Sequence, residues 1–217
     1  TGRPGNILML VGSETGRDGI HGASGLASRT FEEERELRPT VQVSNPFMEK
    51  VLIEACLEIA RTEHVAGLQD LGAAGLTSAA VEAAASGGTG IEIDVARVPP
   101  RDAGLTPYEV MLSESQERML VIVKEGHEEQ VKEHFDRWDL TSTVIGRATD
   151  DGRARVFDGE KLHGDLPIAL LTDPPQYRLD GVKPRELNQL QSYDLDTVPL
   201  PDEPGDAVLL RLLASPN

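Results

Sequence analysis

Short apolar segments alternate with helical patterns up to about residue 167, and this alternation restricts the chain to a few architectures. The segment 7–11 (ILMLV) is bounded by Gly5-Asn6 and by Gly12, which is typical of a buried strand. Further strand patterns occur at 40–43, 65–68, 91–94 and 119–124. Because helical patterns separate these strands, we expect an α/β or α+β layered domain on a mixed sheet.

The helical patterns are predicted at 46–59, 75–86, 106–112 and 128–138. Asn45 is a suitable cap for the first of these, and Pro46 is tolerated in a first turn. Cys56 lies beside an apolar stripe of that helix, so we expect a small buried side chain there and not a reactive thiol. Three more strands are predicted at 143–149, 154–158 and 161–166, joined by turns into antiparallel hairpins.

The amino-acid composition and the hydrophobic patterning of the chain change near residue 167. Eight of its 14 prolines fall from Pro167 to Pro216, and only 208–213 has a pattern, which fits either a strand or a helix. We therefore expect a domain at 1–172 and a proline-rich connector at 173–217, which packs on a surface or leads into a further domain. The chain begins at Thr1, and we expect it to be a piece of a longer polypeptide.

The charge of the chain excludes some classes of partner. Its 217 residues carry 37 acidic and 21 basic side chains, a formal net charge of −16. Such a charge repels phosphate backbones and anionic lipids, so we expect neither nucleic-acid nor membrane binding, although a local pocket for one phosphate is compatible with it. No apolar run is long enough to span a bilayer. Cys56 is the single cysteine, which excludes an internal disulfide and suits a cytoplasmic location.

A loop at 13–25 contains four glycines spaced three residues apart. Its backbone N–H groups suit an anion, with help from Arg17, but a tight loop that merely turns the chain gives the same pattern. The loop matches neither a Walker phosphate loop nor a dinucleotide fingerprint. His21 lies in this loop, and we expect a loop-filling imidazole there. We expect His127 and His134, in or beside a charged helix, to be solvated.

Two further segments have the composition of binding sites. Asp70 ends a strand and precedes a glycine turn and a helix, which is a common place for a ligand site in an α/β sheet. Its carboxylate is suited to binding Mg²⁺, but the side chain could equally cap the helix that follows. The polar block 113–118 (SESQER) offers many donors and acceptors at the junction of a helix and a strand, and an ordinary solvated loop has the same composition.

Taken together, five blocks resemble the synthetase subunit of the phosphoribosylformylglycinamidine synthase family, in the aminoimidazole-ribonucleotide-synthetase superfamily. They are GRDGIHGAS at 16–24, VQVSNPFMEKVLIEACLE at 41–58, GLQDLGAAGLTS at 67–78, GGTGIEIDVARVP at 87–99 and TPYEVMLSESQERML at 106–120. The resemblance implies an α/β/α layered mixed sheet like the carboxyl-terminal domain of the superfamily, partly ferredoxin-like. It places this chain at the end of the first half of the subunit.

The resemblance also implies a reaction. In this family, ATP activates the formamide oxygen of formylglycinamide ribonucleotide, and ammonia then displaces phosphate to give the amidine. The implied cofactors are Mg²⁺ and ATP, with most of the ATP site and all catalytic residues outside this chain. The implied partners are a glutaminase subunit, a small accessory subunit and the remaining domains of the same subunit. The chain alone is therefore expected to be inactive.

The resemblance assigns individual residues as well. Gln42 matches a substrate-binding glutamine, and Asp70 matches a magnesium-binding aspartate. Glu114, Ser115 and Gln116 match a substrate-binding triplet. Ser44-Asn45 departs from the Gly-Asp of the family. The alternatives that we keep open are another ATP-dependent synthetase or kinase of the superfamily, and a non-catalytic interaction domain.

Overall fold

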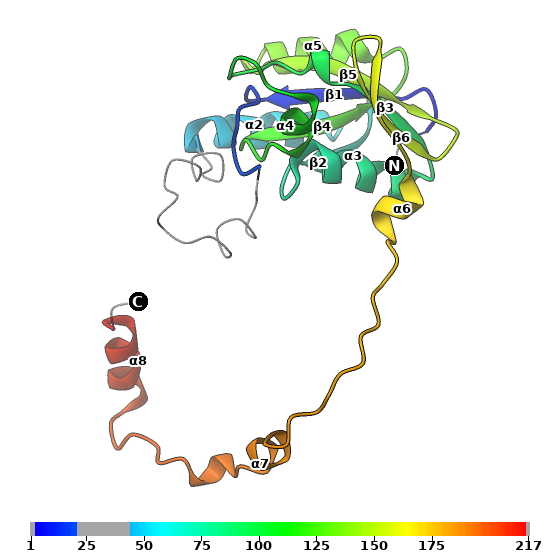
Figure 1. Ribbon diagram of the computed structural model, residues 1–217. Helices are drawn as coiled ribbons and strands as arrows, with labels where there is room; N and C mark the ends of the chain where they lie inside the picture. Colours follow the sequence, from blue (N-terminus) through cyan, green and yellow to red (C-terminus); the bar gives the residue numbers. More distant parts are fainter. Residues whose placement is uncertain (1–2, 21–43, 216–217) are drawn as a thin grey trace. The chain divides into compact units, whose positions relative to one another are not determined.

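The computed structural model describes residues 3–20 and 44–215, and the part of it up to residue 175 is built on a seven-stranded mixed sheet (Figure 1). The strand order is β2-β4-β1-β5-β3-β6-β7, and only β3 and β6 run parallel to each other. The strands are β1 (Ile7–Gly12), β2 (Val65–Asp70), β3 (Gly90–Asp94), β4 (Arg118–Val123), β5 (Ser142–Thr149), β6 (Arg153–Asp158) and β7 (Lys161–Pro167). The strand predicted at 40–43 lies outside the described residues.

The helices around the sheet are α2 (Pro46–Ile59), α3 (Gly75–Gly87), α4 (Pro107–Leu112), α5 (Glu128–Asp136) and α6 (Ile168–Thr172), with a 3₁₀ turn at Val95–Arg97. Four of these helices, α2 to α5, begin within one residue of their predicted starts, whereas α6 and the 3₁₀ turn were not predicted. The side chain of Asn45 accepts a hydrogen bond from the backbone nitrogen of Met48 at 3.2 Å, which caps α2. Thr106 and Glu109 form a capping box at α4.

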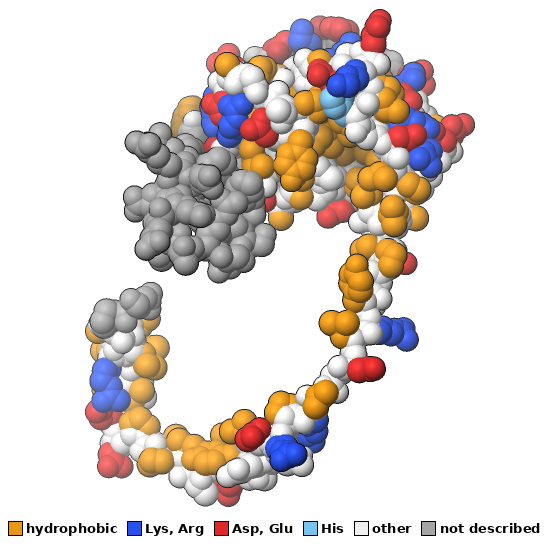
Figure 2. Space-filling view, in the orientation of Figure 1, with side chains coloured by type: hydrophobic (Ala, Val, Ile, Leu, Met, Phe, Trp, Pro, Cys, Tyr) orange, Lys and Arg blue, Asp and Glu red, His pale blue; other side chains and the backbone are white. Residues whose placement is uncertain are grey.

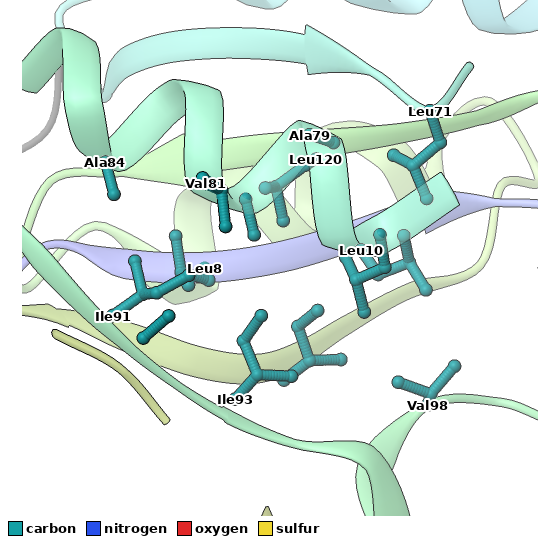
Figure 3. Packing of buried hydrophobic residues seen from close by; sticks show 14 of the residues in the cluster. Leu8, Leu10, Leu71, Ala79, Val81, Ala84, Ile91, Ile93, Val98 and Leu120 are labelled. Carbon is teal, nitrogen blue, oxygen red and sulfur yellow. The ribbon is translucent and has the colours of Figure 1, made fainter. Parts of the chain in front are cut away.

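Both faces of the sheet are covered, because the side chains of β1 alternate between two cores. Leu8 and Leu10 pack with residues of α3 and α4, as Figure 3 shows for α3. Met9 and Val11 pack on the opposite face with residues of α2 and α5. The predicted α/β/α layering is therefore confirmed, with β1 buried at the centre.

One predicted hairpin is wrong. A turn does join β5 to β6, but β3 lies between them and pairs antiparallel with β5 and parallel with β6. Glu92 of β3 forms ion pairs with Arg147 of β5 at 2.8 Å and with Arg155 of β6 at 3.5 Å. These cross-strand charge pairs favour β3 as the neighbour of both strands. The hairpin predicted between β6 and β7 is present.

The chain divides into two units, 1–175 and 176–217. The second unit contains α7 (Leu187–Gln191), a 3₁₀ turn at Leu195–Thr197 and α8 (Gly205–Leu213). None of these elements has a buried residue, and Figure 2 shows hydrophobic side chains at the surface of this unit. The segment 208–213, whose sequence pattern fits either a strand or a helix, is therefore helical. No helix within the described parts of the chain is long and apolar enough to cross a membrane.

Candidate functional site

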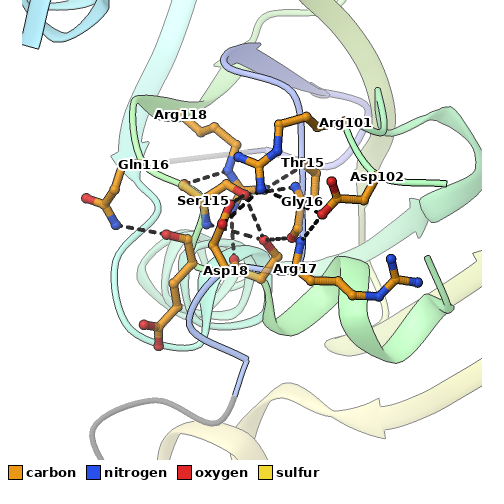
Figure 4. A network of polar contacts seen from close by, with 11 residues as sticks. Thr15, Gly16, Arg17, Asp18, Arg101, Asp102, Ser115, Gln116 and Arg118 are labelled. Atoms are coloured by element: carbon orange, nitrogen blue, oxygen red, sulfur yellow. Dashed lines mark hydrogen bonds and ion pairs between the residues drawn. The ribbon is translucent and has the colours of Figure 1, made fainter. Parts of the chain in front are cut away.

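The polar block 113–118, between α4 and β4, is buried, so its interpretation as a solvated loop is wrong (Figure 4). Relative exposures are 0% for Ser113, 8% for Glu114, 1% for Ser115 and 3% for Arg118. A buried polar segment is stable only when its donors and acceptors are paired. The hydrogen bonds that pair them determine what this segment contacts.

Arg118 is the main donor inside the block. Its guanidinium donates to the carbonyl oxygen of Ser113 at 2.6 Å, to that of Ser115 at 2.8 Å and to Oγ1 of Thr15 at 2.8 Å. Burial lowers the pKa of Arg118 to about 10, despite the nearby charge of Asp18, so the group stays charged at neutral pH. The residue thus fixes the path of the block and joins it to the loop after β1.

Asp18 joins the loop and the block from the other side. Its carboxylate accepts a short hydrogen bond from the Ser115 hydroxyl and an ion pair from Arg101 at 2.9 Å (Figure 4). Its carbonyl oxygen accepts from the backbone nitrogen of Glu114 at 2.7 Å. Gly16 adds two contacts, donating to the Ser115 hydroxyl at 2.9 Å and accepting from the Ser113 hydroxyl at 2.6 Å. The glycine loop and the block are therefore one buried polar network.

Of the two interpretations of the glycine loop, the contacts of Arg17 favour the tight turn. Its guanidinium donates to Glu109 at 2.8 Å and to the carbonyl oxygens of Ala103 and Gly104. Its backbone nitrogen donates to Asp102 at 2.7 Å, and this bond is the main cause that lowers the pKa of the Asp102 carboxyl. Arg17 is thus an anchor that holds the loop against the segment 102–109. His21 and the later glycines of the loop lie outside the described residues.

Asp70 is the last residue of β2 and is exposed. It does not cap α3, because the N-cap position is Ala74 and no side chain caps that helix. Its carboxylate accepts a hydrogen bond from the side-chain amide of Gln69 at 3.4 Å. The helix-cap interpretation is therefore wrong, and the carboxylate lies at the surface at the end of its strand.

The turn after Asp70 contacts the buried block. The backbone nitrogen of Ala74 donates to the carboxylate of Glu114 at 3.1 Å. Gly75 has a φ of +52°, and a Cβ there would overlap the carbonyl oxygen of Ser113. The turn and the block therefore approach each other more closely than any other residue type at position 75 would allow.

The segment that contains Gln42 lies outside the described residues, but the chain directly after it reaches the same place. The backbone nitrogen of Asn45 donates to the carboxylate of Glu117 at 2.8 Å. The side-chain amide of Gln116 donates to the carbonyl oxygen of Glu114 at 2.8 Å. The structure thus brings the block, the loop 15–19, the turn after Asp70 and the start of α2 together.

The residues present offer a limited but chemically suitable site for Mg²⁺. No group of three or more His, Cys, Asp or Glu side chains able to hold a metal ion occurs at 3–20 or 44–215. Mg²⁺ commonly takes one or two carboxylates and completes its coordination with substrate phosphates and water. The exposed carboxylate of Asp70 fits that pattern as a single protein ligand.

The structure also changes the interpretation of two histidines. His134 is 4% exposed, and its Nε2 lies 2.9 Å from the carbonyl oxygen of Ala55. His127 is half-buried beside His64. The prediction that His134 is solvated is wrong, because the charged helix that contains it turns one face toward α2, whereas His127 keeps part of its surface exposed.

Sequence reasoning missed Asp18, Arg101 and Arg118 as parts of the site. Asp18 lies within the glycine loop and Arg118 within the polar block, but a charged side chain in such segments is usually solvated, so neither received a role of its own. The available signal was the position of Arg118, a charge directly before the five apolar residues 119–123 of β4. A charge in that position is buried only if a partner segment from elsewhere in the chain covers it.

Comparison with known proteins places this fold and site in a family. The domain family described as AIR synthase related protein, C-terminal domain, matches residues 3–159, and the chain belongs to that family. Among curated relatives, the phosphoribosylformylglycinamidine synthase subunit PurL of Moorella thermoacetica is 50% identical over 214 residues, and that of Thermomicrobium roseum is 52% identical over 217. The matches cover 98% and 99% of this chain. They cover 29% of each relative, so the chain spans under a third of their length.

Solved structures agree with this assignment. A Thermotoga maritima PurL complexed with FGAR is 36% identical with a TM-score of 0.74, covering 85% of this chain and 30% of that one. A complex of the same protein with ATP is 33% identical with a TM-score of 0.70, covering 85% and 28%. The hydrogenase maturation protein HypE of Escherichia coli is 21% identical with a TM-score of 0.55, covering 77% and 51%, which shows a shared fold alone.

Proposed function

We propose that this chain is the substrate- and Mg²⁺-contacting part of an ATP-dependent amidoligase of purine biosynthesis. The enzyme converts formylglycinamide ribonucleotide and ammonia to formylglycinamidine ribonucleotide. The observation that carries the proposal is identity of about half of all positions to PurL subunits along almost the whole chain. The T. maritima PurL complex with FGAR supports the choice of substrate.

Asp70 is proposed to hold Mg²⁺ together with phosphate oxygens of the substrates. When bound, the ion offsets the negative charge that phosphoryl transfer concentrates between donor and acceptor. The carboxylate suits this role because it is exposed at the end of β2, where phosphates have access to it. The contact between Ala74 and Glu114 keeps the turn after Asp70 beside the proposed substrate-binding block.

Glu114, Ser115 and Gln116 are proposed to bind formylglycinamide ribonucleotide, together with Gln42. Carboxylate and amide groups recognise ribose hydroxyls and a formamide by hydrogen bonding. The Ser115 hydroxyl already bonds to Asp18 and Gly16, so we assign it to holding the triplet in position. Arg118 and Asp18 support the triplet from inside the protein, which keeps its geometry fixed before the substrate arrives.

In the proposed reaction, the formamide oxygen attacks the γ-phosphorus of ATP and ADP leaves. Ammonia then adds to the activated carbon of the iminophosphate, and inorganic phosphate departs as the amidine forms. No catalytic residue is assigned to this chain, and most of the ATP site is proposed to lie in other domains of the subunit. This division fits a chain that spans 29% of its relatives.

A glutaminase subunit and a small accessory subunit are the proposed partners, with the glutaminase as the source of ammonia. A solved assembly titled PurLQS from Thermotoga maritima supports this choice, at 32% identity and a TM-score of 0.70. Neither nucleic acid nor membrane is a proposed partner, in line with the net charge of −16. The proposed location is the cytoplasm.

The test is product formation by the complete polypeptide that carries this chain, supplied with ATP, Mg²⁺, ammonia and formylglycinamide ribonucleotide. We expect one amidine product per ADP, and an Asp70→Asn variant should lose at least about a hundredfold in rate. Asp150→Asn, an exposed aspartate after β5, is the matched control and should keep the rate. ATP consumption with another acceptor would indicate a superfamily kinase or synthetase, and no turnover at all would indicate an interaction domain.

A further inference from the structure

Two histidines face each other away from the site described above. The Nδ1 atoms of His64 and His127 lie 3.1 Å apart, and their ring centroids are 4.8 Å apart with the planes tilted by 37°. His64 directly precedes β2, and His127 directly precedes α5. Both side chains are half-buried.

The backbone around the pair fixes this arrangement. The carbonyl oxygen of His64 accepts a hydrogen bond from the backbone nitrogen of Lys124 at 2.9 Å, and the carbonyl oxygen of Lys124 accepts from the nitrogen of His127 at 3.1 Å. Gly126 allows the tight turn between them with a φ of +86°. The two imidazoles are thus held on a small hydrogen-bonded frame, which lowers the entropic cost of binding a ligand between them.

The geometry fits chelation of one metal ion by the two Nδ1 atoms. With metal–nitrogen distances of about 2.05 Å, nitrogens 3.1 Å apart subtend about 98° at the ion. Extending each bond by about 1.15 Å to the ring centre gives a centroid separation of about 4.8 Å, which is the observed value. A straight hydrogen bond between the rings would instead separate the centroids by about 5.4 Å. The two observed separations therefore match those of two imidazoles that share one metal ion.

We propose that His64 and His127 form a binding site for a divalent transition metal ion that prefers imidazole, such as Zn²⁺ or Cu²⁺. Within the described ranges no third His, Cys, Asp or Glu joins them in a metal-binding group, so water completes the coordination and the ion exchanges readily. Bound there, the ion ties the start of β2 to the turn between β4 and α5. This site is independent of the proposed Mg²⁺ ligand, because Mg²⁺ prefers oxygen ligands.

The test is calorimetric titration of Zn²⁺ into the full 217-residue chain, without an affinity tag that would itself bind the ion. We expect one Zn²⁺ per chain, and His64→Asn or His127→Asn should each weaken binding by at least about tenfold. His163→Asn is the matched control, since His163 lies on β7 and should leave the affinity unchanged. Mg²⁺ at the same concentration should give no signal that depends on either histidine of the pair.

A second measurement does not depend on the variants folding. The electron paramagnetic resonance spectrum of Cu²⁺ bound to the unaltered chain should show two nitrogen ligands. The proposal is overturned by a spectrum that shows fewer than two nitrogen ligands, or by the absence of Zn²⁺ binding to the unaltered chain. It is also overturned if the His64→Asn and His127→Asn variants, with unchanged circular dichroism, bind Zn²⁺ as tightly as the unaltered chain.

Discussion

Arg118 shows how much of the site depends on one buried side chain. Its guanidinium bonds to two carbonyl oxygens of the block and to Thr15 of the loop. These acceptors have little access to water, because Ser113, Ser115 and Thr15 are each at most 1% exposed. Without the guanidinium these acceptors would stay buried without one of their hydrogen bonds, and this would lower the free energy of unfolding substantially.

We predict that Arg118→Met lowers the free energy of unfolding by about 3–5 kcal/mol, since it removes the charged partner of several buried groups. Denaturant unfolding measures this directly. Arg97→Met is the matched control, because Arg97 is an exposed arginine whose ion pair with Asp94 spans 4.0 Å, and it should cost less than about 1 kcal/mol. Equal losses in the two variants would show that the buried network does not stabilise the fold.

Cys56 gives a prediction that depends on pH. Burial, and to a lesser degree the charge of Glu49, raises the pKa of its thiol to about 11 from an ordinary value of 9.0. The folded chain therefore favours the neutral thiol. This contribution to stability is complete below about pH 8.5 and is lost as the pH rises toward 11.

At about pH 8 we expect the native thiol to react with a disulfide reagent on the order of a hundredfold more slowly than a free thiol, because so little thiolate is present. Denaturing urea should remove the difference, which controls for the reagent. If the native chain reacted as fast as the denatured chain, the thiol of Cys56 would be neither buried nor raised in its pKa.

At this scale the sequence predicts part of the site. Asp70, Glu114, Ser115 and Gln116 follow from resemblance to a family, whereas burial of Arg118 and Asp18 depends on contacts between residues about 100 positions apart. A glycine loop is recognisable from its composition, but whether its backbone donors face a ligand or a neighbouring side chain is decided by the fold. Here the backbone nitrogen of Gly16 donates to the Ser115 hydroxyl, and that of Arg17 donates to the Asp102 carboxylate.

At the scale of elements, the approach of α3 to the buried block is the critical contact. Two successive residues at the start of the helix, the N-cap Ala74 and the first helical residue Gly75, have positive φ values of 59° and 52°. This backbone turns the chain so that Ala74 donates to Glu114 while Gly75 lies against Ser113. The start of the helix thus positions the turn after Asp70 against the substrate-binding block that we propose.

We predict that Gly75→Ala costs at least about 2 kcal/mol of unfolding free energy, from positive φ and from overlap with the Ser113 carbonyl. Gly88→Ala is a matched control at the other end of α3. It has a similar φ of +65° but nothing within 4 Å of the added carbon, so only the backbone cost of about 1 kcal/mol applies. Thermal unfolding of both variants distinguishes the two costs, and an equal loss would contradict the close approach.

Local patterns predicted the seven strands of the sheet and the helices α2 to α5, but they predicted neither α6 and α7 nor the order of the strands. The turn after β5 is tight, and Asp151 accepts hydrogen bonds from Thr149 and Arg153 across it. Such a turn reverses the chain without deciding which strand lies alongside. Insertion of β3 depends on pairing between strands that lie more than 50 residues apart, as the contact of Glu92 with Arg147 shows.

At the scale of the whole molecule, the proposed division of the active site gives this chain binding groups and places phosphoryl transfer in other domains of the subunit. We predict that the isolated 217-residue chain forms no amidine from ATP, ammonia and formylglycinamide ribonucleotide. An assay of ADP and product, run beside the complete subunit at equal concentration, measures this. Turnover comparable to that of the complete subunit would contradict the proposed division of the active site.

We propose that the turn after Asp70 and the block at 113–118 form one binding site. The most direct test is calorimetric titration of formylglycinamide ribonucleotide with Mg²⁺ into the complete subunit carrying Asp70→Asn, Glu114→Gln, or both. We predict that each single change weakens binding at least about tenfold, and that the double change departs from additivity by at least about 0.5 kcal/mol. Independent, additive effects, or affinities equal to that of Asp150→Asn, would contradict the account.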